Sequence, residues 1–174
     1  METPIIDPAT GLWSAAQLIT HLTTQFARAA EAGAGVSVAA ADIDDFASIT
    51  RLCEPDERVA VLRQVGARLR GALRKSDAVG RYAGEEFLIV FDPTSRGQAG
   101  PIDPCLVMER VRKAVSDRPF HTLSGPVTIT ISAGAATATP GFDDPCSVIT
   151  AAIQALYRAK VEGNCVQVLP TAVV

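Results

Sequence analysis

A tight turn in the middle of the chain separates two short segments that both have the composition of β-strands. The first strand covers Ala78 to Tyr82, the turn falls at Ala83 and Gly84, and the second strand covers Glu86 to Phe91. Two strands joined by so short a turn pair antiparallel, as a hairpin. Any sheet that this chain forms must therefore contain an antiparallel pair, so a purely parallel sheet is excluded.

Helical and extended patterns alternate along the rest of the chain, with proline and glycine clusters between them. The expected helices are Ser14–Ala32, Glu57–Leu73, Pro104–Ser116 and Ser147–Glu162, and the further strands are Val36–Ile43, Val127–Ala136 and Val166–Leu169. We expect Val127–Ala136 to be half-exposed, because Thr128, Thr130 and Ser132 alternate with apolar neighbours. The pattern predicts an α/β fold: a single domain with a central mixed five-stranded sheet, flanked by helices, whose hairpin carries the sequence AGEEF.

The composition is that of one globular domain. The chain has 174 residues, of which 48% are hydrophobic, and this is enough to bury one ordinary core. We divide it into an N-terminal extension (1–6), the domain itself (7–169) and a C-terminal tail (170–174). A net charge of −3 and scattered basic residues argue against nucleic acid as a partner.

The sequence contains no sign of membrane insertion, export or disulfides. No apolar run approaches the roughly 20 residues of a membrane span, and the first residues lack the basic and apolar regions of a signal peptide. We therefore expect a cytoplasmic protein. The four cysteines are far apart and have no C-x-x-C spacing, so we interpret them as reduced packing residues: Cys53, Cys105, Cys146 and Cys165.

Acidic residues gather where two of the expected strands end. Asp42, Asp44 and Asp45 fall at the end of the first strand, and Glu85 and Glu86 lie at the hairpin. Mg²⁺ prefers hard oxygen ligands and takes one or two protein carboxylates beside a phosphate. From spacing alone, a metal site for phosphoryl transfer and a set of acids that simply face water remain equally open.

Five motifs occur in a characteristic order and cover nearly the whole chain. They are DPATGL (Asp7–Leu12), DIDDF (Asp42–Phe46), RYAGEEF (Arg81–Phe87), TISAGAA (Thr130–Ala136) and ALYRAK (Ala155–Lys160). In this order the chain resembles the GGDEF domain of diguanylate cyclases, which condense two molecules of GTP into cyclic di-GMP. The resemblance implies a role in cyclic di-GMP signalling and Mg²⁺ (or Mn²⁺) as the cofactor when nucleotide is bound.

The resemblance also implies roles for individual residues. Asp42, Glu86 and the backbone carbonyl of Ile43 match the positions that bind two metal ions, which would stabilise the entering and leaving oxygens. Glu85 matches the position that helps to deprotonate the attacking ribose hydroxyl, so Glu85 and Glu86 are the candidate catalytic residues of an active enzyme. Gly84 and Lys160 match phosphate-binding positions.

Several positions that bind the nucleotide in this family carry other residues here. The phosphate-binding lysine is replaced by Ala47, and the two guanine-reading residues by Thr50 and Val59; Glu54–Pro55 replaces a glycine-histidine pair, and Asn164 replaces an arginine. Valine makes no hydrogen bond to a base, although the Thr50 hydroxyl could donate one to a different base edge. We therefore expect weak or absent cyclase activity.

The hairpin itself departs from the family at Ala83, where glycine is usual. A methyl group could hinder the turn or the approach of phosphates, or it could be a tolerated turn substitution, and both interpretations stay open. Arg81 and Tyr82 match the family's usual pair before the hairpin, and we expect them to support the turn.

A short motif before the hairpin suggests a second ligand site. Arg74 and Asp77 form an R-x-x-D sequence at the offset where many diguanylate cyclases bind their product at an inhibitory site. In such a site the arginine forks onto guanine O6 and N7, and the aspartate accepts from the base N–H groups. An inherited surface pair without a ligand is the alternative interpretation.

Three functions remain open at this point. The favoured one is a degenerate GGDEF domain that binds cyclic di-GMP through the R-x-x-D site and acts as a regulatory module. The others are an active cyclase with altered base contacts or purine preference, and a protein-interaction scaffold that binds no nucleotide. GTP, a second copy of the chain and a partner signalling protein are the further candidate partners, and the chain is either an isolated domain or a piece of a longer protein.

Overall fold

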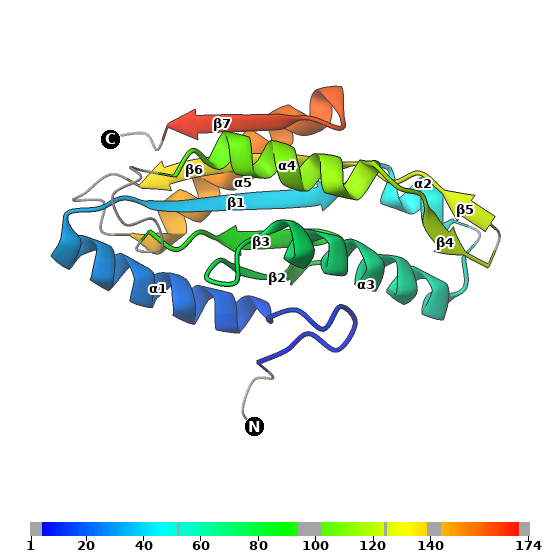
Figure 1. Cartoon of the computed structure of the whole chain (residues 1–174), viewed down its shortest axis with the longest axis horizontal. Coiled ribbons are helices and arrows are strands. Elements are labelled where there is room, and N and C mark those ends of the chain that lie inside the picture. Colours follow the sequence, from blue (N-terminus) through cyan, green and yellow to red (C-terminus); the bar gives the residue numbers. More distant parts are fainter. Residues whose placement is uncertain (1–4, 52, 94–101, 124, 139–143, 171–174) are drawn as a thin grey trace.

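Five strands form one sheet in the order β2-β3-β1-β6-β7 (Figure 1). The structure is a computed structural model that describes residues 5–51, 53–93, 102–123, 125–138 and 144–170. The strands of this sheet are β1 (Val36–Ile43), β2 (Ala78–Ala83), β3 (Glu86–Val90), β6 (Ile131–Ala138) and β7 (Val166–Pro170). β1 runs antiparallel to β3 and β6, β2 runs antiparallel to β3, and β7 runs parallel to β6. The expected mixed five-stranded sheet is confirmed.

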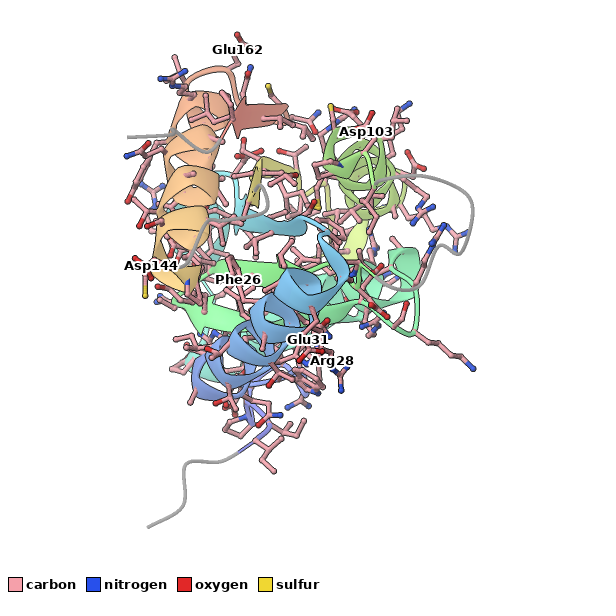
Figure 2. The ribbon with its side chains drawn as sticks, turned by 90° about the vertical axis from the view of Figure 1, so that its left-hand side faces the viewer. Phe26, Arg28, Glu31, Asp103, Asp144 and Glu162 are labelled. Carbon is pink, nitrogen blue, oxygen red and sulfur yellow. The ribbon has the colours of Figure 1, made fainter. Side chains whose placement is uncertain are left out.

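The helices of the described residues are α1 (Ala15–Ala32), α2 (Phe46–Thr50), α3 (Pro55–Ala72), α4 (Pro104–Ser116) and α5 (Pro145–Glu162). Side chains cap the first turns of three of them. At α1, Ser14 accepts from the amide of Gln17, and at α4 and α5 the carboxylates of Asp103 and Asp144 accept from backbone amides of the first turn. Figure 2 labels Asp103 and Asp144 at these helix starts. All four helices predicted from periodicity are therefore present, within a few residues of their expected ends.

The two faces of the sheet bury separate cores. Successive residues of a strand point to opposite faces, so Ala39 and Ala41 of β1 pack with α3 and α4, whereas Val38 and Ala40 pack with α1 and α5. In Figure 1, α3 and α4 lie in front of the sheet and α5 lies behind it. Because helices cover both faces, all eight residues of β1 are buried, which explains why its sequence is an almost unbroken apolar run.

A glycine in β6 allows α5 to pack directly on the sheet. A Cβ atom at Gly134 would overlap the backbone of Leu156 and Ala152 in α5. Backbone atoms in a packed core cannot move aside cheaply, so any side chain here would push the helix away from the sheet. The close approach brings the C-terminal end of α5 beside the C-terminal end of β1.

The strand expected at Val127–Ala136 differs from the strand that forms. β6 spans Ile131–Ala138 instead, and every residue in it except Thr137 is buried, so the prediction of a half-exposed strand is wrong. The reason is that α4 and α5 cover its two faces. Ser132 can be fully buried at low cost because its hydroxyl donates to Asp44, at an O–O distance of 2.7 Å.

Three short elements were not predicted from the sequence. They are the five-residue helix α2 and the strands β4 (Phe120–Thr122) and β5 (Gly125–Val127), which form a separate antiparallel pair. Side chains of α3 hold β4 in place: Gln64 exchanges two hydrogen bonds with the backbone of His121, and the Glu57 carboxylate accepts from the amide of Leu123. In Figure 1, α2, β4 and β5 all lie near the C-terminal end of β1.

Among the described residues, no helix has the length and apolar character needed to cross a bilayer. All four cysteines are free thiols, as expected. Three of them are half-buried, but Cys146 is exposed at the start of α5, so its interpretation as a packing residue is wrong.

Candidate functional site

Asp42 and Glu86 lie directly opposite each other on β1 and β3. Opposed residues of antiparallel strands have Cβ atoms about 4.5–5.5 Å apart and point to the same face of the sheet. Asp42 is almost completely buried, with 5% of its surface exposed, and Glu86 is half-buried. The fold therefore brings the two candidate metal ligands together, with Ile43 as the last residue of β1.

Burial and nearby acidic groups disfavour the charged forms of both carboxylates. Burial raises the pKa of the Asp42 carboxyl; Glu85 and Asp44 raise it further, whereas the hydrogen bond and charge of Lys160 oppose the shift. Burial also raises the pKa of Glu86, followed by the charges of Asp42 and Glu85, and Lys160 again lowers it. A buried group of like charges is the environment that a bound cation would stabilise.

Lys160 supplies the cation of this group. Its ammonium extends from the last turn of α5 and forms a hydrogen-bonded ion pair with Oδ1 of Asp42. The lysine side chain is 35% exposed, whereas the Asp42 side chain is 7% exposed. The candidate phosphate-binding lysine therefore lies beside the candidate metal ligand.

Asp44 has a different environment from its neighbour Asp42. Its carboxylate accepts hydrogen bonds from the hydroxyls of Thr130 and Ser132, each at 2.7 Å, and from the amide of Asn164 at 2.8 Å. These contacts join β1 to the start of β6 and to the turn after α5. Asp44 therefore fixes the geometry of the strand end around Asp42.

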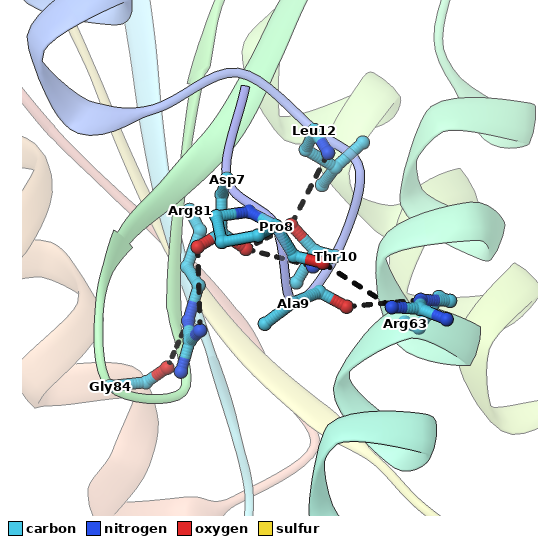
Figure 3. Close-up of polar contacts among 8 residues, drawn as sticks. All are labelled: Asp7, Pro8, Ala9, Thr10, Leu12, Arg63, Arg81 and Gly84. Atoms are coloured by element: carbon cyan, nitrogen blue, oxygen red, sulfur yellow. Dashed lines mark hydrogen bonds and ion pairs between the residues drawn. The ribbon is translucent and has the colours of Figure 1, made fainter. Parts of the chain in front are cut away.

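The hairpin turn is held by a second set of contacts, shown in Figure 3. Gly84 has a left-handed backbone (φ 47°), and its carbonyl accepts from Nε of Arg81 at 2.7 Å. Arg81 also forms an ion pair with Asp7 at 3.5 Å, so the expected support of the turn by this arginine is confirmed. Ala83 lies outside the left-handed region, so the turn conformation favours the interpretation of Ala83 as a tolerated substitution.

The strand-end residues fit a divalent metal of the magnesium type. The described residues contain no cluster of three or more histidine, cysteine, aspartate or glutamate side chains that could hold a metal ion. Two carboxylates and a backbone carbonyl are nevertheless a suitable set for Mg²⁺, which keeps several waters and shares phosphate oxygens as ligands. Asp42, Glu86 and the Ile43 carbonyl are the groups that could hold it.

The positions that would bind the nucleotide offer few hydrogen-bonding groups. Ala47 is exposed and apolar, and Val59 is half-buried. Thr50 is 2% exposed, and its hydroxyl donates to the carbonyl of Phe46 at 2.7 Å, within α2. The hydroxyl therefore already has an acceptor, and our expectation that it could donate to a different base edge is not supported by the structure.

Asn164 occupies a left-handed backbone position (φ 48°), which asparagine adopts more readily than most residues. Its side-chain oxygen accepts from Nη1 of Arg112 at 2.7 Å, and Arg112 also forms an ion pair with Glu109 at 2.8 Å. Arg112 was not identified from the sequence, because its contact with Asn164 joins segments 52 residues apart. The Arg112 guanidinium is thus already bound to Glu109 and Asn164.

The R-x-x-D motif forms a fastened turn between α3 and β2. The Asp77 carboxylate accepts from the amides of Arg74 and Asp92, at 3.1 and 3.3 Å, and is 4% exposed. Arg70, another residue missed in the sequence, donates to the carbonyls of Asp77 and Arg74. The Arg74 side chain is exposed and makes no hydrogen bond or ion pair with any described residue.

The turn and the acid cluster lie at opposite ends of the hairpin. β2 starts just after Asp77, where Ala78 pairs with Val90, and it ends where Ala83 pairs with Glu86. Six residues of strand span about 17–20 Å. The domain therefore has two separate candidate sites, one at each end of β2.

The protein is an α/β domain with a mixed sheet. It places carboxylates at the adjoining ends of two antiparallel strands and a lysine beside them. The family described as "Diguanylate cyclase, GGDEF domain" matches residues 5–165. The chain belongs to the GGDEF family.

Three comparisons illustrate this relationship. Diguanylate cyclase DgcP of Pseudomonas aeruginosa is 37% identical over 163 residues, which cover 94% of this chain and 23% of the relative. Response regulator PleD of Caulobacter vibrioides is 31% identical over 166 residues, which cover 94% of this chain and 36% of the relative. The GGDEF domain of DgcB from Caulobacter crescentus, solved in complex with c-di-GMP, has a TM-score of 0.84 at 26% identity and covers 97% of this chain and 94% of that one. The chain thus spans less than two-fifths of these two curated relatives.

Proposed function

We propose that this domain is a cyclic di-GMP-binding regulatory module with weak or absent cyclase activity. The ligand would bind at the turn that contains Arg74 and Asp77. The observation that carries the proposal is the exposed guanidinium of Arg74, which has no partner among the described residues and extends from a turn whose backbone is firmly held.

The chemistry of the turn supports this ligand. A planar guanidinium can donate two parallel hydrogen bonds to the O6 and N7 acceptors of guanine. The Asp77 carboxylate already accepts two backbone N–H groups, and each oxygen keeps a second lone pair for a base N–H. Because Asp77 is nearly buried, we assign most of the ligand affinity to Arg74. The related DgcB domain, solved in complex with c-di-GMP, supports the ligand class.

Energetics at the other end of β2 support weak catalysis. A hydrogen bond to a charged group contributes roughly 1.5–3 kcal/mol. The absence of cations at Ala47 and Asn164 therefore removes about 3–6 kcal/mol of triphosphate binding, which is a factor of about 10²–10⁴ in affinity. With Thr50 buried and Val59 apolar, the guanine edge also lacks its readers, and an unpaired base edge in a closed site adds a further penalty.

The intact acids favour a second candidate function, an active cyclase with altered base contacts. In that enzyme, Asp42, Glu86 and the Ile43 carbonyl would hold Mg²⁺ or Mn²⁺, which would neutralise phosphate charge when bound. Gly84 and Lys160 would bind phosphate, and Glu85 would assist deprotonation of the ribose hydroxyl. Two nucleotide-loaded copies of the domain would have to face each other, so a homodimer or a partner protein belongs to this function.

Calorimetric titration with cyclic di-GMP tests the main proposal. We expect the wild type to bind, and both Arg74→Ala and Arg74→Lys to weaken binding about 10- to 100-fold, because lysine cannot form the two-pronged contact. Arg158→Ala, at an exposed position on α5, removes the same charge as a matched control and should bind like the wild type. Asp77→Ala should weaken binding and also lower the melting temperature, since it removes two hydrogen bonds from backbone amides to the Asp77 carboxylate.

No binding by the wild type, or equal binding by the wild type and both Arg74 variants, would overturn the proposal and favour a scaffold that binds no nucleotide. A second assay separates the enzymatic alternative. Concentrated protein is incubated with Mg²⁺ or Mn²⁺ and either GTP or ATP, and the products are resolved by chromatography. Rapid formation of cyclic di-GMP would contradict weak catalysis, and a product from ATP alone would indicate altered purine preference.

A further inference from the structure

The contact between Lys160 and Asp42 joins two residues that each have another assigned partner. The ammonium of Lys160 forms an ion pair with Oδ1 of Asp42, and no other ion pair to Asp42 forms within the described residues. We call the strand ends at Asp42 and Glu86 the acid end. In the cyclase considered above, Asp42 of the acid end would bind a divalent cation and Lys160 would bind phosphate. Neither group can make its assigned contact fully while the two are paired.

We propose that Lys160 occupies the cation position at Asp42 until metal and nucleotide arrive together. In this scheme the divalent cation displaces the ammonium from Asp42, and the freed ammonium moves to a nucleotide phosphate. The inference rests on the proposed metal-binding role of Asp42. It adds that metal and nucleotide bind with positive coupling, and that Lys160 is the residue that transmits this coupling.

The burial of the two side chains explains why the lysine pairs with Asp42 in the absence of ligands. A nearly buried carboxylate without a counter-charge is strongly disfavoured, and Asp42 has Glu86 opposite it and Glu85 nearby. Asp44 has less need of the ammonium, because its carboxylate already accepts three hydrogen bonds, from Thr130, Ser132 and Asn164. Asp42 is therefore the acid of this group that most needs a cation.

The same burial difference explains how the lysine can leave. Its side chain is 35% exposed and ends a flexible four-carbon stem at the last turn of α5, so the ammonium can turn toward solvent without disturbing the fold. Asp42 is fixed within the β1–β3 and β1–β6 ladders and cannot follow it. The carboxylate stays in place while its cation is exchanged.

The scheme makes a prediction that a permanent structural ion pair does not make. Removing a competitor for Asp42 should strengthen metal binding when no nucleotide is present. Removing a phosphate ligand should weaken nucleotide binding when metal is present. Because coupling between two ligands is reciprocal, a variant without the lysine should also lose much of the mutual strengthening of metal and nucleotide.

The test measures Mn²⁺ binding directly by electron paramagnetic resonance at pH 8, with and without a non-hydrolysable GTP analogue. Without nucleotide, we expect Lys160→Gln to bind Mn²⁺ about five- to tenfold more tightly than the wild type, and Lys160→Arg, which keeps a cation, to resemble the wild type. With the analogue, wild-type Mn²⁺ affinity should rise several-fold more than that of Lys160→Gln, whose smaller rise reflects the phosphate oxygens that the metal shares. Lys113→Gln, at an exposed position on α4, controls for the loss of one positive charge.

Asp42→Asn identifies the site, because it should remove Mn²⁺ binding in every background. If Lys160→Gln binds Mn²⁺ no more tightly than the wild type while Asp42→Asn removes binding, the exchange scheme is overturned and the metal site remains. If no variant binds Mn²⁺ at millimolar concentration, both the scheme and the metal assignment fail. Cyclic di-GMP titration of the same samples reports on the R-x-x-D site independently, so failure of the proposed receptor function is recognised separately.

Discussion

The two ends of β2 differ in how their charged residues are used. At the start of β2, Asp77 accepts two backbone N–H groups, and Arg74 extends from the same turn into solvent. At the other end, the Glu86 carboxylate lies opposite Asp42, and burial and neighbouring charges raise the pKa of both. The first arrangement stabilises the fold and still presents a donor, whereas the second crowds like charges that Lys160 offsets only in part.

This difference separates two properties of the domain, recognition of a guanine base and binding of a metal ion. The R-x-x-D turn keeps the groups that would recognise a guanine base, and the acid end keeps the groups that would hold metal. In the proposed function, the acid end lacks the contacts to the nucleotide itself, at Ala47, Thr50, Val59 and Asn164. The comparison therefore favours a domain that binds the product of diguanylate cyclases more readily than their substrate.

The largest expected effect comes from restoring the nucleotide contacts. We predict that Ala47→Lys, Val59→Asp and Asn164→Arg together increase affinity for a GTP analogue at least about 10²-fold, because two phosphate contacts and one base contact return. Calorimetry with Mg²⁺ measures the change, and the same triple variant with Asp42→Ala is the control. Cyclic di-GMP affinity should stay constant. No gain in analogue affinity would mean that the acid end lacks more than these contacts.

The single replacements sharpen this result. Ala47→Lys alone should increase analogue affinity about 10- to 100-fold, since position 47 is exposed and open to a long side chain. Asn164→Arg should gain less than about tenfold, because the new guanidinium would lie beside that of Arg112. The left-handed backbone should also lower the stability of this variant by about 1 kcal/mol. A larger gain from Asn164→Arg than from Ala47→Lys would contradict the local geometry at these two positions.

A smaller effect is expected on cyclic di-GMP affinity, at the turn that contains Arg74 and Asp77. Arg70 donates to the carbonyls of Asp77 and Arg74, so Arg70→Gln should loosen the turn without removing a predicted ligand contact. We expect cyclic di-GMP affinity to fall by up to about tenfold, because the loosened turn would have to be ordered when the ligand binds. Arg63→Gln, which instead loses contacts to the carbonyls of Ala9 and Pro8, should leave affinity unchanged. Equal affinities of the two variants would show that turn rigidity does not matter.

The smallest expected effect is on stability. Because the folded state raises the pKa of Glu86, folding penalises its charged form; this penalty is absent below the unfolded pKa of about 4.3, grows as pH rises toward the folded pKa, and is complete above it. Glu86→Gln should therefore melt at a higher temperature than the wild type at pH 7.5. The gap should close as the pH is lowered to about 3.5.

Thermal melts across this pH range, with the surface variant Glu31→Gln as control, measure the effect without any ligand. The control should melt like the wild type throughout, because Glu31 is exposed on α1. If Glu86→Gln is less stable than the wild type at pH 7.5, the acids stabilise the fold, and their crowding is not a sign of a ligand site.

The sequence was informative wherever burial follows a regular period. The long helices and the strands of the hairpin were predicted because their apolar residues repeat over several turns or over a whole strand. α2, β4 and β5 are only three to five residues long, which is too short for a period to appear. β6 was misplaced because Ser132 is polar but buried, and only its contact with Asp44, 88 residues away, explains this.

The same limit applies to the candidate site. That Asp42 and Glu86 meet could be predicted, since strand ends and a hairpin place them there. The ion pair of Lys160 with Asp42 and the hydrogen bond of Arg112 with Asn164 join residues 118 and 52 positions apart, and no local pattern encodes them. The hydrogen bond from the Thr50 hydroxyl to the Phe46 carbonyl likewise forms only because α2 begins at Phe46.

Calorimetric titration of one protein sample with two ligands tests the central comparison most directly. Cyclic di-GMP reports on the turn at Arg74, and a non-hydrolysable GTP analogue with Mg²⁺ reports on the acid end. We predict that cyclic di-GMP binds at least about 100-fold more tightly than the analogue, because two phosphate contacts are missing at the acid end. Equal or tighter binding of the GTP analogue, or no binding of cyclic di-GMP, would contradict the assignment of this domain as a receptor for the product.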